Sequence, residues 1–209
     1  MTTMTKGSEH IDRVFDFLRT AEGLKSVLRY ASTTSGRKES VADHSWRVAL
    51  MAFVVGDGLG LKIDFSRAMK MAIVHDIAES IAGDIDFVRI SDGEVTREEK
   101  RSAELVAMTE LKETLSGSAG EELYAIWKEY DAGETEVARY VRAIDKLETL
   151  TQLVESGHSI YDRPELIANY ADVAVAAFPE LTPMLRALKG RLHEEFDKGS
   201  FDWKPGYDV

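Results

Sequence analysis

The residues of this sequence that could do chemistry are a few histidines and aspartates placed beside apolar side chains. His75 is followed directly by Asp76 at the end of the apolar segment MKMAIVHDIAES. Asp145 follows Ile144 inside VARYVRAIDKLETL, at the edge of the most apolar helical face of the chain. A buried charged group is costly unless it has a partner. The identity of these partners is therefore the first question that the sequence raises.

Two kinds of partner are open. Taken alone, each histidine suits a surface imidazole or a satisfied buried one; the five are His10, His44, His75, His158 and His193. Asp145 likewise suits an ion pair with Arg142 or Lys146. Alternatively, one divalent metal ion satisfies two imidazoles and two carboxylates at once, and this donor set suits Mn, Co, Fe, Ni, Zn or Mg. Such an ion makes hydroxide available near neutral pH and offsets the charge of a phosphate.

Two further acids follow His75 and Asp76. Glu79 lies four residues after His75, on the same face of a continuous helix, where it could act on a metal-bound water as a general base. Otherwise Glu79 is a solvated charge at a helix end. Asp84 follows Gly83 in a predicted loop that could fold over the same pocket, and alone it is an ordinary loop aspartate.

The order of these residues resembles that of a known family. His44, the pair His75-Asp76 and Asp145 reproduce the H…HD…D order of the HD-domain metal-dependent phosphohydrolases. The stretches ESVADHSWRVALMA, VHDIAESIAGDI, TREEK and AIDKLETL are similar to the family of HD-domain-containing protein 2 and the YfbR-like 5′-deoxynucleotidases. The similarity runs from about Leu24 to Leu153.

The resemblance implies a role for each matching residue. One divalent ion has four protein ligands, which are His44, His75, Asp76 and Asp145. Glu79 acts on the nucleophilic water, and Asp84 is an acid of the substrate pocket. Arg29, fifteen residues before His44, orients the phosphate, a role that suits a bidentate guanidinium. Tyr30 stands where the bacterial YfbR-like 5′-deoxynucleotidase has a tryptophan beside the sugar. The catalytic set is thus Glu79, Asp84 and Arg29, the substrate-binding set is Arg29, Tyr30 and Asp84, and the family implies a homodimer.

Several differences narrow the activity. No histidine lies between His75 and Asp145, so a site with one metal ion is expected rather than the two-metal site of HD phosphodiesterases. Ser80 follows Glu79 where HD hydrolases of guanosine tetraphosphate show a second acid. Tyr30 in place of tryptophan bears on sugar selectivity. After Gly83-Asp84 the chain reads Ile85-Asp86-Phe87 without the family's proline, so the pocket loop is expected to have its own shape.

Helices must position these residues, because helical spacing dominates the sequence. Ile11, Phe15 and Leu18 lie on one face of a predicted helix over residues 8–22. A second helix is expected over 40–57, a third begins after the cap Asp64, and residues 84–93 form a loop. Thr96 opens a capping box for a helix to about 115, and Ser118 opens a second box. The strongest apolar face runs from 137 to 154, and the charges of 96–104 are expected on a solvated face.

The predicted fold is all-α. Apart from a few residues, no alternation typical of strands occurs, and no Pro/Gly/Ser-rich linker divides the chain. We expect a single HD domain over residues 1–209, with the motifs in a core of about 24–153 and C-terminal helices over 163–199 packed on it.

Composition limits the partners. The chain has 209 residues, no cysteine and a net charge of −11. So acidic a surface repels phosphate backbones and anionic lipids, which argues against duplex nucleic acid and membrane partners. The first nine residues are polar and no stretch approaches a membrane span, which favours a cytoplasmic protein.

The predicted function is a metal-dependent phosphohydrolase that releases phosphate from (deoxy)nucleoside 5′-monophosphates. Two alternatives stay open: an HD hydrolase of another phosphate ester, and a catalytically silent helical module that binds a nucleotide or metal.

Overall fold

The computed structural model describes residues 6–209, so the first five residues of the polar start lie outside the described residues. The long helices are α1 (Lys6–Ala21), α2 (Val41–Gly58), α3 (Phe65–Val74), α6 (Arg97–Leu115), α7 (Gly117–Ala132), α8 (Glu136–Ser156) and α11 (Thr182–Gly199). The short helices are α4 (Glu79–Ala82), α5 (Phe87–Ser91), α9 (Pro164–Ile167) and α10 (Asp172–Ala176), with 3-10 turns η1 (Glu22–Lys25), η2 (His158–Ile160), η3 (Pro179–Leu181) and η4 (Pro205–Tyr207). The predicted helical fold class is confirmed.

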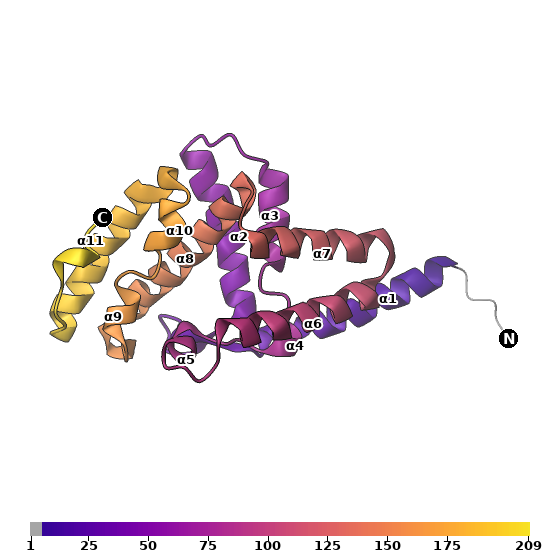
Figure 1. The fold of residues 1–209 in the computed structure, drawn as a ribbon, viewed down its shortest axis with the longest axis horizontal. Helices are drawn as coiled ribbons and strands as arrows, with labels where there is room; N and C mark the ends of the chain where they lie inside the picture. Colours follow the sequence, from indigo (N-terminus) through magenta and orange to yellow (C-terminus); the bar gives the residue numbers. More distant parts are fainter. Residues whose placement is uncertain (1–5) are drawn as a thin grey trace.

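Helix α8 lies at the centre of the larger hydrophobic core. Its apolar face carries Tyr140, Ile144, Leu147, Leu150 and Leu153, all fully buried. Helices α2, α3, α7, α10 and α11 pack against it (Figure 1). Burying a large apolar side chain contributes about 1.5–3 kcal/mol, so this face accounts for much of the stabilisation that holds the helices together.

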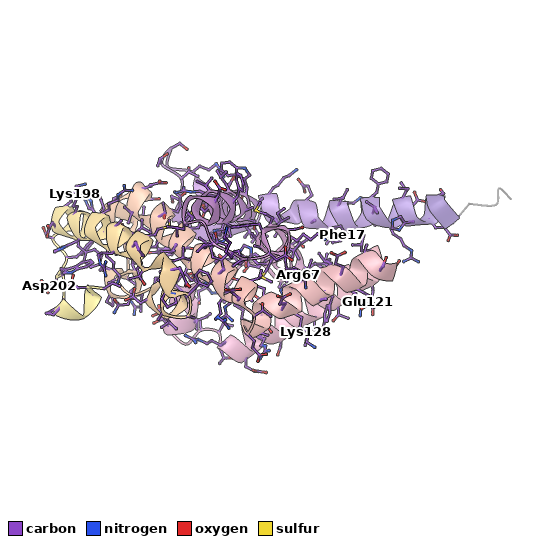
Figure 2. The ribbon with its side chains drawn as sticks, turned by 90° about the horizontal axis from the view of Figure 1, so that it is seen from above. Phe17, Arg67, Glu121, Lys128, Lys198 and Asp202 are labelled. Atoms are coloured by element: carbon purple, nitrogen blue, oxygen red, sulfur yellow. The ribbon has the colours of Figure 1, made fainter. Side chains whose placement is uncertain are left out.

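A second, smaller core joins α6 and α7 to α1 and α4. It contains Met108 and Leu111 of α6 together with Trp127 of α7. Helices α1 and α6 run side by side in Figure 1, and the start of α1 lies far from the C-terminal helix α11. Seen from above in Figure 2, Lys198 and Asp202 mark one end of the molecule and Glu121 lies toward the other. Of the residues described, none belongs to a helix long and apolar enough to cross a membrane.

The predicted helix starts are confirmed at two positions and wrong at one. The Asp64 side chain accepts from the Arg67 amide at the start of α3, and Thr96 forms a capping box with Glu99. The box predicted at Ser118 is wrong, because α7 already begins at Gly117 without a side-chain cap. The tight turn that joins α6 to α7 uses positive φ values of 52° at Ser116 and 60° at Gly117.

Three local features differ from the helix-and-loop prediction. Strands β1 (Leu28–Ser32) and β2 (Lys38–Ser40) form an antiparallel hairpin. The loop predicted over 84–93 contains α5, whose first amides bond to the Asp86 side chain. The helix expected to carry His75 through Glu79 is interrupted, because α3 ends at Val74 and tight turns over 75–78 lead into α4.

Candidate functional site

The four predicted metal ligands come from three elements that meet at the core. His44 projects from the first turn of α2, His75 and Asp76 lie in the turn after α3, and Asp145 lies on α8. His44, His75 and Asp145 are buried, while Asp76 keeps 19% of its side chain exposed. The fold therefore joins residues 44 and 145, which are about half the chain apart, and leaves Asp76 as the ligand nearest to solvent.

The donor atoms are spaced like neighbouring ligands of one ion. His44 Nε2 lies 3.3 Å from His75 Nε2, 3.6 Å from Asp76 Oδ2 and 3.2 Å from Asp145 Oδ1. His75 Nε2 lies 3.2 Å from Asp76 Oδ2. With metal–ligand bonds of about 2.0–2.2 Å, adjacent ligands around an ion are about 3 Å apart. His44, His75 and Asp76 form one group of potential ligands, and Asp145 adjoins it through His44.

The hydrogen bonds of the two imidazoles also suit a metal ion. His75 Nδ1 donates to the Ala72 carbonyl at 2.9 Å, and His44 Nδ1 donates to the Glu148 carboxylate. When Nδ1 of each neutral ring carries the proton for these hydrogen bonds, the Nε2 atoms of His44 and His75 direct their lone pairs at each other. Two lone pairs at 3.3 Å repel unless a positive charge lies between them, either a proton on one Nε2 or a metal ion bound to both, so the residues present fit a divalent ion.

Charge leads to the same conclusion. Burial and the Arg29 charge lower the pKa of His44, but Glu148 and Asp145 outweigh them and raise it to about 9. Burial would raise the pKa of Asp145, yet Lys146 and the two histidines hold it well below its usual range. The carboxylates thus favour a positive charge at this position, which a divalent ion supplies.

Asp145 also has the ion pair that its alternative interpretation required. Lys146 Nζ lies 2.9 Å from Asp145 Oδ2, and the Tyr130 hydroxyl donates to the same oxygen at 2.7 Å. The other oxygen, Oδ1, faces His44. One carboxylate therefore serves both purposes, and the ion pair with Lys146 leaves one oxygen for the cluster. Arg142, the other proposed partner, instead contacts the Asp131 carbonyl.

Arg29 lies beside the cluster because the hairpin carries it there. Its Nη1 is 3.4 Å from Asp76 Oδ2, its Nη2 donates to Thr149 Oγ1 at 3.0 Å, and its Nε is 3.3 Å from Glu39 Oε2. The side chain is only 11% exposed. A guanidinium held in this way beside Asp76 is preorganised to meet an anion at the cluster.

Glu79 is buried beside the cluster rather than solvated. Its Oε1 lies 3.3 Å from Lys100 Nζ, and, within residues 6–209, its Oε2 has no hydrogen-bond partner. Burial raises the pKa of Glu79 well above its usual value, and the charges of Asp76 and Asp84 add to this effect, while Lys100 opposes it. Burial also raises the pKa of Asp84, which interacts electrostatically with Arg29 and Lys100.

Tyr30 contacts a different set of residues. Its hydroxyl donates to the Ile160 carbonyl at 2.9 Å and accepts from the Asp162 amide at 3.1 Å. Its ring meets Phe87 edge to face at 5.2 Å, and Phe87 in turn lies 4.9 Å from Tyr170. The hydroxyl is therefore engaged by backbone, and the ring is the part of Tyr30 that faces the pocket loop.

Three residues of this region were missed from the sequence. Glu148 and Glu39 are buried beside His44, with which they form a second group of potential ligands. Lys100 reaches Glu79 and the Ile85 carbonyl from α6, so the expectation of a fully solvated face over 96–104 is wrong at this position. Glu148 could have been found, since it lies three residues after Asp145 on the same apolar helix. The positions of Glu39 and Lys100 depend on how separate elements pack, and the signal for them in the sequence is that they lie in the family-like stretches ESVADHSWRVALMA and TREEK.

The fold and this cluster define a recognised class of protein. The chain belongs to the HD-domain family, whose model matches residues 21–172 and is described as an HD domain. The 5′-deoxynucleotidase HDDC2 of Mus musculus is 31% identical over 177 residues, which cover 83% of this chain and 85% of the relative. The protein of the same name from Homo sapiens is 31% identical over 180 residues, with 84% of each chain covered.

Solved structures agree at the level of the fold. A protein from Magnetospirillum magnetotacticum MS-1, named a predicted metal-dependent phosphohydrolase, has a TM-score of 0.74 and 24% identity over 99% of this chain and 100% of that one. A protein from Pyrococcus horikoshii OT3 has a TM-score of 0.68 and 26% identity over 85% of this chain and 99% of that one. Membership of the family and the helical fold are thus supported by independent comparisons.

Proposed function

We propose that this chain is a metal-dependent phosphohydrolase that releases phosphate from (deoxy)nucleoside 5′-monophosphates. The family match and the relatives named 5′-deoxynucleotidase support this function. The observation that carries it is the set of donor atoms 3.2–3.6 Å from His44 Nε2, with Arg29 Nη1 3.4 Å from Asp76 Oδ2. A cationic centre beside a buried arginine suits a small dianion such as a phosphate monoester.

The proposed ligands of one divalent ion are His44, His75, Asp76 and Asp145. The mixed nitrogen and oxygen donors suit Mn, Co, Fe, Ni, Zn or Mg. When bound, such an ion lowers the pKa of water and offsets negative charge. The proposal is tested apart from catalysis by the metal content of the purified chain and by its loss in Asp76→Ala.

The chain's own residues then divide the remaining work. Arg29 binds the phosphate oxygens and holds the phosphorus in line with the attacking water. Glu79 accepts the proton that this water loses as its oxygen bonds to phosphorus. The bond from phosphorus to O5′ breaks, and O5′ takes up a proton, for which the half-buried Asp84 is the proposed acid. The products are a nucleoside and inorganic phosphate. Tyr30 borders the sugar with its ring and so bears on the choice between deoxyribose and ribose.

Phosphate release from a panel of substrates tests this function. The panel contains the five deoxynucleoside 5′-monophosphates, their ribose counterparts and several other phosphate esters, with protein loaded with Mn, Co or Mg. We expect activity on the deoxynucleotides that is lost in Asp76→Ala and kept in Asp57→Ala, a matched change of an exposed aspartate on α2. Phosphate release from other esters but from no nucleotide would support a phosphohydrolase and contradict nucleotides as its substrates. Release from nothing in the panel would contradict the proposal.

We also propose that residues 1–209 form one HD domain that works as a cytoplasmic homodimer. The packing of α11 on α8 supports a single domain. On α2, three apolar side chains at helical spacing, Trp46, Leu50 and Phe53, are 44–67% exposed, which is a surface that a second copy could cover. Size-exclusion chromatography with light scattering measures the mass in solution, and the mass of a single chain at all concentrations would contradict the dimer.

A further inference from the structure

One buried carboxylate beside the metal cluster has no role in the proposed reaction. Glu148 is fully buried, and its Oε2 accepts the hydrogen bond of His44 Nδ1. It lies on α8 three residues after Asp145, so one helix supplies both a proposed ligand and the partner of another ligand. Residues three apart on a helix share a face, which is why both reach the same imidazole.

The other carboxylate oxygen of Glu148 lies near an arginine. Its Oε1 lies 3.5 Å from Arg47 Nε, while Arg47 Nη1 donates to Gln152 Oε1 at 2.7 Å and pairs with Glu155 Oε2 at 2.8 Å. Arg47 follows His44 on α2 by three residues. The carboxylate of Glu148 therefore lies between two groups of α2: its Oε2 accepts the hydrogen bond of His44, and its Oε1, which has no hydrogen-bond partner within residues 6–209, lies beside the charge of Arg47.

A second metal ion is the competing explanation for these acids. Glu39, His44 and Glu148 bring three potential donor atoms together. However, Arg29 Nε lies 3.3 Å from Glu39 Oε2, and Arg47 lies beside Glu148. Two guanidinium groups already offset the two carboxylates, so another cation there would be repelled by both. The charges favour a hydrogen-bonding role for Glu148.

We propose that Glu148 is the positioning residue of His44: it keeps the proton on Nδ1 and thereby directs the lone pair of Nε2 at the metal position. This inference rests on the proposed metal site. A histidine ligand commonly donates its other N–H to a carboxylate, which selects the tautomer and the orientation of the ring. Without the carboxylate, nothing that His44 contacts in the described structure favours the Nδ1–H tautomer over the other.

The substitution Glu148→Gln tests the role with little change of shape. A glutamine amide can donate to Nδ1, which favours the proton on Nε2, where it competes with the metal ion. We expect Mn²⁺ to bind about 10–100-fold more weakly, as measured by titration calorimetry on protein stripped of metal. The matched control is Glu155→Gln, which also removes a partner of Arg47 but lies at the surface, and it should change the affinity by about twofold or less.

A second measurement reads the tautomer of His44 directly, first in the wild-type chain and then in Glu148→Gln. In metal-free protein labelled with ¹⁵N, at a pH at which His44 is neutral, wild-type His44 should carry its proton on Nδ1, and in Glu148→Gln the fraction with this tautomer should fall. Equal Mn²⁺ affinity in Glu148→Gln and wild type would overturn the inference while leaving the metal site in place. A proton on Nε2 of wild-type His44, or two Mn²⁺ per chain that fall to one in Glu148→Gln, would overturn it as well. If the wild-type chain binds neither Mn²⁺ nor Zn²⁺, the proposed function fails and this inference fails with it.

Discussion

Replacing Lys100 by methionine tests how Glu79, the proposed general base, is kept ionised. Lys100 Nζ lies 3.3 Å from Glu79 Oε1, and its side chain is 26% exposed against 3% for Glu79. At this distance Coulomb's law with an effective dielectric constant of about 20 gives an upper limit of about 5 kcal/mol. Measured hydrogen bonds to charged groups contribute about 1.5–3 kcal/mol, the range that suits a partly exposed lysine. Methionine keeps an unbranched side chain that is one atom shorter and removes the charge.

The direction of the expected pH shift follows from the protonation state in which Glu79 acts. Glu79 accepts a proton only when it is ionised, and burial already raises its pKa. Lys100 lowers that pKa, so Lys100→Met raises it further and moves the acid limb of the rate–pH profile to higher pH. Below that limb, about 1.5–3 kcal/mol corresponds to a loss of kcat of about ten- to a hundredfold. Above it, the rate should return toward that of the wild type.

The assay is the pH dependence of kcat for phosphate release by metal-loaded protein. The matched control is Lys112→Met, on the same helix, whose lysine pairs with Glu121 at 2.9 Å rather than with the site. The control should follow the wild-type profile. A loss of the same size at every pH would refute the reasoning, because it would show that Lys100 acts by holding the Ile85 loop rather than by its charge on Glu79.

The remaining predictions concern metal removal and the core that carries the site. A chelator should lower the melting temperature of the wild type. A metal ion present at a hundred times its Kd adds about 2.7 kcal/mol to the free energy of unfolding, which corresponds to about 5–10 °C for a chain of this size. Asp76→Ala should melt at the same temperature with and without the chelator. Gly56→Ala should cost about 1–3 kcal/mol in urea unfolding, because the added Cβ would lie 2.2 Å from the Phe65 ring and 2.8 Å from the Tyr140 hydroxyl. Its metal affinity should be unchanged, and an unchanged urea midpoint would contradict the packing described.

Local rules predicted the elements that depend on nearby residues. The α8 helix, the Asp64 cap and the Thr96 box follow from apolar spacing and side-chain caps, which act within a few residues. The hairpin β1–β2 escaped because its strands have only five and three residues, too short for a pattern of alternation. The Ser118 box failed for a different reason: the tight turn at Ser116 and Gly117 lets the next helix begin before the predicted cap.

The functional site likewise has features that the sequence determined and features that it did not. The sequence by itself determined the helical class, the family and the four proposed ligands, since the order of those residues and the motifs around them lie along the chain. Only the tertiary structure decided which charges surround them. Lys100 reaches Glu79 from α6, Glu148 reaches His44 from α8, and Glu39 reaches Arg29 within the hairpin. Such contacts join residues up to 104 positions apart. Their physical effect on charge and proton position depends on distances of a few ångströms, which only the packing of helices on one core determines.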